Sequence, residues 1–299
     1  MSGSVVTATD GRSFLAPALT SFTSSSLTIG DTGSFETATL ESIDQSSIAV
    51  VDGASFTTPA SLTSYSSSRG HGVNEQRTLF SAQGSGSILD LSSLQTLDGN
   101  FGGLGSVRQS IVATEGAAIN LSGVTSVSGG GTGANGGGPY EFRTADAASI
   151  DLSSLETVTG NGGQGVLFTN GGTMVIGTAA ATTELTTANI DNAGELTTGN
   201  LNLTGTFDQT GTGTLRIDAA GITAGVDFSQ IVVSGTSTID GAVEINPISP
   251  YVPAAGDQLL IISGSGLTGS FATTTVTGLD PALAAQSVID TTGASIEIN

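Results

Sequence analysis

The sequence predicts an all-β fold, a right-handed parallel β-helix with a β-structured capping region at its C-terminal end. Three observations predict it: a repeat of about 30 residues, glycine-rich loops that keep step with the repeat, and no sustained helical periodicity. One such unit cannot bury its apolar side chains alone. Coils stacked about 4.8 Å apart can, because they pair every backbone and build a continuous core.

The repeat is clearest in residues 89–97, 119–127 and 150–158, which align without gaps. They share the pattern apolar-x-Leu-x-x-apolar-x-Thr/Ser-apolar, at offsets of 30 (119 − 89) and 31 (150 − 119) residues, and weaker copies begin at Phe35 and Phe56. Stacking these copies predicts two inward columns of apolar residues with an outward polar row between them. The first column is Phe35, Phe56, Leu89, Ile119 and Ile150, the second is Leu40, Leu62, Leu94, Val124 and Leu155, and the polar row is Glu36, Thr57, Asp90, Asn120 and Asp151.

Gly-Gly-x-Gly segments follow the copies at 102–105, 130–133 and 162–165. From residue 166 the period shortens into Asn/Gly-x-Leu units, which predict narrower coils whose Gly or Asn residues take corners at positive φ. We therefore expect three regions. These are an N-terminal cap or lead-in at 1–30, the β-helix repeats at 31–205, and the β-helix end and cap at 206–299.

Three prolines, Pro247, Pro250 and Pro253, support a cap in the last region. Proline blocks a ladder hydrogen bond, and a covered coil end prevents uncontrolled stacking. A leucine-rich-repeat horseshoe is the alternative, since Leu91, Leu94 and Leu97 are spaced by three. Against it, no helical half-repeat recurs, and the variable spacing is typical of β-helix loops.

Composition excludes several classes of function. The chain has 6 cations, all arginine, against 26 carboxylates, for a net charge of −20. Nucleic-acid binding through a basic face is excluded by the small number of cations. The lack of cysteine excludes disulfides and Cys-type zinc sites, and the lack of lysine excludes a Schiff base. A hydrophobic content of 37% with a mean hydropathy of +0.21 favours a folded chain over disorder.

Composition also predicts location. Absent lysine and cysteine with abundant Ser, Thr and Gly are typical of bacterial secreted surface proteins. No basic segment followed by an apolar stretch begins the sequence, so we expect an excised piece or another export route. No window reaches about 18 uninterrupted apolar residues, so no transmembrane helix is expected.

The last third contains the most distinctive segments: 205–215, 226–235, 241–245, 253–257 and 269–271. They resemble the C-terminal passenger region of autotransporter-type adhesins and other large bacterial surface β-helix proteins. There, a Tyr/Phe-x-Gln-aliphatic-x-Val-x-Gly strand precedes Pro-x-x-Gly-Asp and Gly-x-Phe turns. The similarity covers about 95 residues (205–299) and implies a β-helix cap and an extracellular location. The sequence reaches Asn299 without a membrane β-barrel, so we expect any anchor to be missing or to be supplied by a partner.

Candidate carbohydrate contacts are Arg69, His71, Arg108 and Arg143. Gly70-His71-Gly72 is similar to the Gly-His-Gly of pectin-hydrolysing β-helices. Those enzymes also need an Asp pair and a lysine, which this sequence lacks, so we interpret His71 as a loop residue. The arginines, with Arg77, could contact uronates, but a surface of charge −20 favours counter-ions.

A calcium site is the one metal hypothesis. Asp90, Asn120 and Asp151 offer oxygen ligands that suit Ca²⁺, but Asp90 and Asp151 are expected about 10 Å apart, too far for one ion. We therefore interpret this row as a solvated polar ladder. The segment 130–135 resembles the repeats-in-toxin calcium motif but has Asn where Asp is required, so a turn is expected.

These observations predict a non-enzymatic, extracellular or cell-surface structural or adhesive β-solenoid, within a filament, coat or matrix. Expected partners are further copies, other surface proteins or glycans, and no cofactor is expected. The alternative is a carbohydrate-binding or carbohydrate-degrading β-helix, similar to a tailspike or a polysaccharide lyase.

Overall fold

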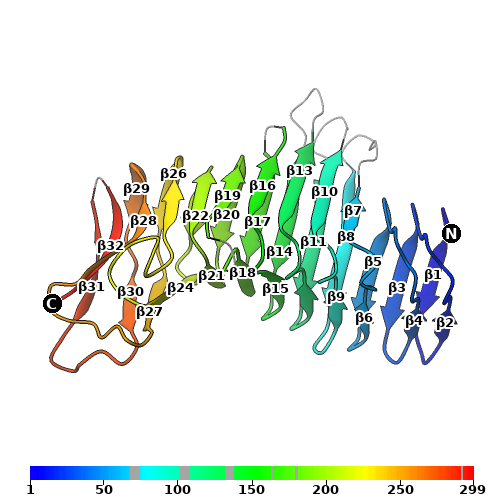
Figure 1. Cartoon of the computed structure of the whole chain (residues 1–299), viewed down its shortest axis with the longest axis horizontal. Coiled ribbons are helices and arrows are strands. Elements are labelled where there is room, and N and C mark those ends of the chain that lie inside the picture. The colour runs from blue at the N-terminus through cyan, green and yellow to red at the C-terminus, as the bar shows by residue number, and fades with distance from the viewer. Residues whose placement is uncertain (68–74, 102–107, 132–137, 163, 179–180, 291) are drawn as a thin grey trace.

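The computed structural model is a column of stacked β-coils with the two termini at opposite ends (Figure 1). It describes residues 1–67, 75–101, 108–131, 138–162, 164–178, 181–290 and 292–299. Within these ranges the secondary structure consists of strands, turns and bends, with no helix. No segment of the described chain forms a helix long and apolar enough to cross a membrane.

Three long sheets make up the walls of the column. In spatial order, sheet 1 contains β1 (Val5–Ala8), β3 (Ser26–Gly30), β5 (Ser47–Val51), β8 (Gln76–Gln83), β11 (Arg108–Thr114), β14 (Tyr140–Thr144), β17 (Val166–Asn170), β20 (Ala188–Asn192) and β23 (Phe207–Gln209). Sheet 2 contains β6 (Ser55–Thr57), β9 (Ile88–Asp90), β12 (Ala118–Asn120), β15 (Ser149–Leu152), β18 (Thr173–Ile176), β21 (Glu195–Thr198), β24 (Thr214–Ala219), β27 (Ala242–Pro247) and β30 (Thr273–Val276). Sheet 3 contains β7 (Ser64–Ser66), β10 (Thr96–Phe101), β13 (Ser126–Gly131), β16 (Thr157–Gly160), β19 (Thr183–Thr186), β22 (Leu201–Thr204), β25 (Ile231–Val233), β28 (Gln258–Ser263), β32 (Gly293–Ile298) and β31 (Ala285–Ile289). Two further pairs are β2 (Ser13–Leu15) with β4 (Ser34–Glu36) and β26 (Thr236–Ile239) with β29 (Gly266–Gly269).

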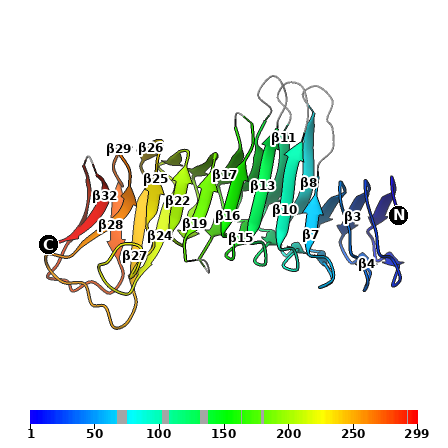
Figure 2. The same ribbon diagram turned by 45° about the horizontal axis from the view of Figure 1, so that its top comes forward.

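Each complete coil passes from sheet 1 to sheet 2 to sheet 3, as β11, β12 and β13 do before β14 returns to sheet 1. Neighbouring strands along each wall are parallel except where β32 and β31 join the C-terminal end of sheet 3, and the sheet 3 strands lie side by side in Figure 2. This arrangement confirms the parallel β-helix. The horseshoe alternative is wrong, because it requires a helical half-repeat and the described residues contain no helix.

The two predicted apolar columns are present. In sheet 2, Leu89, Ile119 and Ile150 occupy one register position on consecutive strands, and this column continues to Met174, Leu196 and Leu215. At its N-terminal end, Phe14 stacks on Phe35 with ring centroids 5.2 Å apart. The members of the second column are all buried. Because each inward strand position meets its counterpart one coil away, the 30-residue repeat builds a continuous apolar core.

Sheet 1 adds an aromatic column that the repeat did not indicate. Phe142 and Phe168 share a register position and stack with centroids 5.3 Å apart. Ile190 and Phe207 continue the column along the next two strands. Burying each such side chain contributes roughly 2–3 kcal/mol to folding.

The corner between sheets 1 and 2 is built in two ways. In several of the early coils it is a tight turn with two central residues at positive φ. Asp52 (56°) and Gly53 (78°) occupy these positions in one coil, and the turn is closed by the Ala54 amide donating to the Val51 carbonyl at 3.1 Å. These are the features of a type I′ turn, for which Asp-Gly is a preferred pair.

In the later coils a buried amide ladder replaces this turn. Asn170 donates from Nδ2 to Asn192 Oδ1 at 2.8 Å, and Asn192 donates from Nδ2 to Gln209 Oε1 at 3.0 Å. At the N-terminal end of the ladder, the Thr144 hydroxyl donates to Asn170 Oδ1 at 2.6 Å. All four side chains are buried, so each is stabilised by hydrogen bonds that solvent cannot supply.

The expectation of Gly or Asn at positive φ is wrong for these corners. Asn192, Gly172 and Gly194 do not have a positive φ. The Asn192 side chain is instead part of the amide ladder. Glycine is required at 194 for space instead, because a Cβ there would lie 2.2 Å from the Gly172 carbonyl oxygen of the preceding coil. The coils do become shorter: successive members of the sheet 2 column, Met174, Leu196 and Leu215, are 22 (196 − 174) and 19 (215 − 196) residues apart.

The two ends of the column differ. At the C-terminal end, β31 and β32 form an antiparallel hairpin that joins sheet 3 beside β28 and covers the last coil. The parallel pairing of β27 with β30 ends at Ile245, two residues before Pro247. At the other end, β1 and β2 pair in parallel with β3 and β4, so residues 1–30 contain the first coil of the same column together with β3, the first strand of the second coil.

Candidate functional site

The outer face of sheet 1 carries two rows of side chains between β8 and β23. One row contains Thr78, Ser110 and Glu141 at matching register positions. The other contains Ser81, Val112, Arg143, Thr169, Asp191 and Asp208. Strand pairing places successive members of a row about 4.8 Å apart, so this face brings side chains from six coils into one strip.

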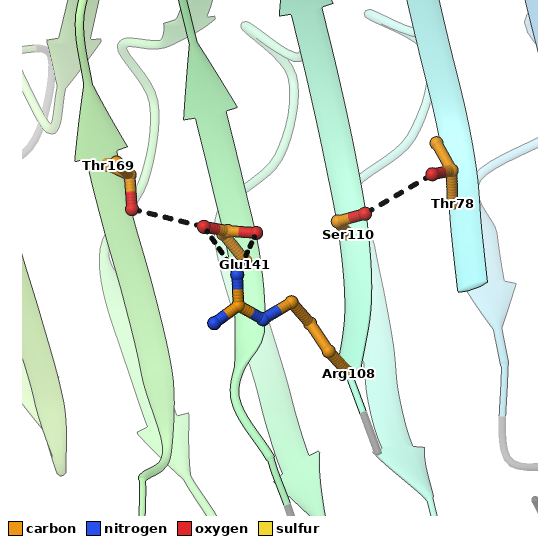
Figure 3. A network of polar contacts seen from close by, with 5 residues as sticks. All are labelled: Thr78, Arg108, Ser110, Glu141 and Thr169. Atoms are coloured by element: carbon orange, nitrogen blue, oxygen red, sulfur yellow. Dashed lines mark hydrogen bonds and ion pairs between the residues drawn. The ribbon is translucent and has the colours of Figure 1, made fainter. Parts of the chain in front are cut away.

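Glu141 is the centre of a polar network on this face (Figure 3). Nη1 of Arg108, on the preceding strand β11, donates to both of its carboxylate oxygens, at 3.2 and 3.3 Å. Thr169, on the following strand β17, donates from its hydroxyl to Glu141 Oε1 at 3.2 Å. The Glu141 side chain is only 5% exposed, so its charge requires these partners.

Arg143 lies on the same strand and the same face as Glu141, two residues further on. Its guanidinium is exposed and forms no ion pair or hydrogen bond with any side chain that the structure describes. Beside it is a shallow hollow of about 300 Å³ that is lined by residues of β8, β11 and β14. Its lining residues include Thr78, Ser81, Gln83, Val112, Thr114 and Arg143.

Two aspartates continue the Arg143 row toward the C-terminal coils. Asp191 and Asp208 lie directly opposite each other on β20 and β23. Partial burial raises the pKa of Asp191, and the neighbouring charges of Asp208 and Glu141 raise it further. Neither aspartate lines the hollow. The strip therefore has two parts. Arg143 places an unpaired positive charge at the hollow, and beyond Thr169 the facing carboxylates of Asp191 and Asp208 repel each other.

The structure separates the predicted arginine contacts from one another. Arg108 is a counter-ion of Glu141, as the acidic composition favoured. Arg77 donates to the Gln45 carbonyl oxygen, and Arg216 bridges Glu195 and Glu244 at 3.2 and 3.3 Å. Arg69 and His71 lie outside the described residues. Among the candidate contacts that lie in the described residues, only Arg143 has a guanidinium without an ion pair or hydrogen bond to a described side chain.

The candidate calcium residues form a polar ladder, and their side-chain oxygens accept hydrogen bonds within local turns. Asp90, Asn120 and Asp151 share a register position on β9, β12 and β15. In each, Oδ1 accepts a hydrogen bond from the backbone amide two residues later, at 2.8–3.0 Å. Across the described ranges, no group of three or more His, Cys, Asp or Glu side chains could hold a metal ion.

Two parts of this strip were not recognised from the sequence, namely Glu141 and the pair Asp191 and Asp208. Each lies in a strand of sheet 1, where the repeat is less regular than in sheet 2. The available signal was the alternation of apolar and polar residues in Tyr140–Thr144 and Ala188–Asn192. Because every second residue of a strand shares a face, this alternation places Glu141 and Asp191 on the outer face.

No protein-family model matches the chain. No curated protein matches its sequence either.

Proposed function

We propose that this chain is a structural or adhesive β-solenoid of the bacterial cell surface or extracellular space, working within a filament, coat or matrix. The observation that carries the proposal is the continuity of the column. Three sheets of nine, ten and nine strands run side by side with matched register, so that nearly every coil is bonded to two neighbours. Such a column is a stiff rod that presents evenly spaced side chains.

Surface chemistry supports the same role. A net charge of −20 opposes side-by-side association of columns, so association would occur at an uncovered coil edge rather than along the sides. Strand β1 lies at the outer edge of sheet 1 and carries Val5, which is 80% exposed. An edge strand with an exposed β-branched residue can pair with a further strand.

The location rests on the sequence. The lack of lysine and cysteine favours a secreted protein. The resemblance of residues 205–299 to autotransporter-type passenger regions supports an extracellular adhesin.

Electron microscopy of the purified full chain tests the proposal. We expect ordered filaments or sheets, which should disappear in Val5→Lys because a charge on an edge strand prevents pairing. Val226→Lys is the matched control, since Val226 is also 80% exposed but lies in a loop. Dispersed particles that depolymerise an acidic polysaccharide, detected as new reducing ends, would overturn the structural role.

A second function is carbohydrate binding or degradation. The observation that favours it is the sheet 1 strip, which combines an unpaired arginine with two facing carboxylates. Glycoside hydrolysis uses a pair of carboxyl groups in which one, the general acid, has a raised pKa, as the pKa of Asp191 is raised here. If the chain degrades polysaccharide, Asp191→Asn should abolish the release of reducing ends.

A further inference from the structure

We infer that the hollow beside Arg143 binds a single uronate residue of an otherwise neutral glycan. The inference rests on the proposed adhesive function and names the ligand class of its surface. It starts from the pairing of the charges on sheet 1. The Glu141 carboxylate is the nearest acidic group along the strand to Arg143, yet Arg108 and Thr169 occupy it. Arg108 thereby leaves the Arg143 guanidinium free for an external anion.

The lining of the hollow selects the ligand. A guanidinium presents parallel N–H donors that match a planar carboxylate. Around it, the hydroxyls of Thr78, Ser81 and Thr114 can donate or accept, as sugar hydroxyls do. Gln83 already donates from Nε2 to Glu115 at 3.0 Å, which leaves its carbonyl oxygen as an acceptor. A volume of about 300 Å³ is at the small end of ligand pockets and suits a short oligosaccharide segment.

Charge beyond the hollow limits the ligand to one carboxylate. Asp191 and Asp208 continue the same row, two and three strands past Arg143, and the whole molecule has a charge of −20. Since electrostatic screening at physiological salt extends over about 8 Å, a second carboxylate directed along the row would meet these aspartates. A polyuronate that extends from Arg143 toward these aspartates is therefore disfavoured, and a neutral chain with one uronate is preferred.

Calorimetric titration of the full chain tests this inference with three probes: xylotriose bearing one glucuronate, neutral xylotetraose, and trigalacturonate. We expect the first to bind, and the other two to bind at least about tenfold more weakly, which is the scale of one charge-assisted hydrogen bond. Arg143→Gln should reduce the affinity for the first probe by a similar factor. Arg12→Gln is the matched control because Arg12 is also exposed, without an ion pair to any described residue, and lies in the first coil.

Arg108 supplies a second test that loss of folding cannot imitate. Arg108→Gln should weaken binding by releasing the Glu141 carboxylate toward Arg143, and Arg108→Gln with Glu141→Gln should restore it. Equal binding of the neutral probe, no binding of the uronate probe, or no effect of Arg143→Gln each overturns the site. Filaments without uronate binding overturn only the site, whereas uronate binding by particles that never assemble overturns only the filament role.

Discussion

The early and late coils of this column solve the same problem differently at the corner between sheets 1 and 2. In the coil that contains Val51–Ala54, the backbone reverses through two residues at positive φ, and the corner is exposed to solvent. In the coil that contains Asn192 and Gly194, the Asn192 side chain is buried, and its amide supplies the hydrogen bonds. The first solution depends on backbone conformation, and the second depends on space and polar pairing between coils.

This difference determines what each corner tolerates. An exposed turn has room for an added side chain where the φ of that residue permits one. The hydrogen bond that closes the turn lies within one coil, so a change there does not affect the neighbouring coils directly. A ladder connects successive coils, so a change in one coil leaves unpaired groups in two others. We therefore expect substitutions in residues 166–214 to cost more than the equivalent substitutions before residue 148.

The largest difference should be seen for glycine to alanine substitutions. In Gly194→Ala the new Cβ would lie 2.2 Å from one backbone oxygen and 2.7 Å from a backbone nitrogen of Gly172, so the coils must separate. We expect a loss of about 4 kcal/mol in the free energy of unfolding, measured by urea titration. Gly53→Ala is the control, because it meets nothing closer than 3.6 Å and adds only the positive-φ conflict, a net loss of about 0.5–1 kcal/mol after the change in chain entropy. Equal losses would show that the two corners do not differ in packing.

Asn192→Ala should have the next largest effect. Asn192 accepts from Asn170 and donates to Gln209 and to the Thr214 carbonyl at 3.3 Å, so its removal leaves buried polar groups unpaired on both neighbouring coils. We expect a destabilisation of about 3 kcal/mol in the same urea titration. Asn246→Ala removes an exposed amide that bonds to Asp218 and should change stability by less than about 0.5 kcal/mol. A small effect at Asn192 would mean that water replaces the ladder.

The sequence predicted the regular part of this comparison and missed the irregular part. Stacking of Leu89, Ile119 and Ile150 follows from a repeat, because equal spacing places equivalent residues at one register position. The role of Asn192 could not be read in this way. An Asn-x-Gly segment is compatible both with a corner at positive φ and with a buried amide ladder. Which of the two forms depends on how closely the neighbouring coil packs against the segment.

The candidate site shows the same limit. The sequence identified Arg108 and Arg143 as equivalent candidates. Their difference depends on Glu141, which lies 33 residues from Arg108 and reaches it only through the pairing of β11 with β14.

Ala147 offers a smaller test of the exposed turns. It occupies the second central position of its turn with φ at 59°, where Gly116 stands one coil earlier with φ at 74°. Ala147→Gly should raise the free energy of unfolding by about 0.5–1 kcal/mol, because the relief of the Cβ conflict exceeds the added chain entropy. Gly116→Ala should lower it by a similar amount. A destabilised Ala147→Gly variant would show that this alanine contributes packing that outweighs its conformation.

The outer face of sheet 1 extends the comparison to charge, with the smallest expected effect. Arg143 lies on the early coils, whereas Asp191 and Asp208 face each other on the later ones. Because burial and Asp208 raise the pKa of Asp191 above its ordinary value of 3.8, the folded state binds this proton more tightly than the unfolded state does.

The stability that this proton contributes is present below pH 3.8 and is lost as the pH rises through the raised pKa. Asp191→Asn should therefore stabilise the column at pH 7, by less than about 1 kcal/mol at this half-buried position, and should give no gain at pH 3. The melting temperature at the two pH values measures this. Glu36→Gln removes one exposed carboxylate elsewhere, so an equal gain in that variant would assign the effect to net charge, whereas a gain confined to Asp191→Asn assigns it to the facing pair.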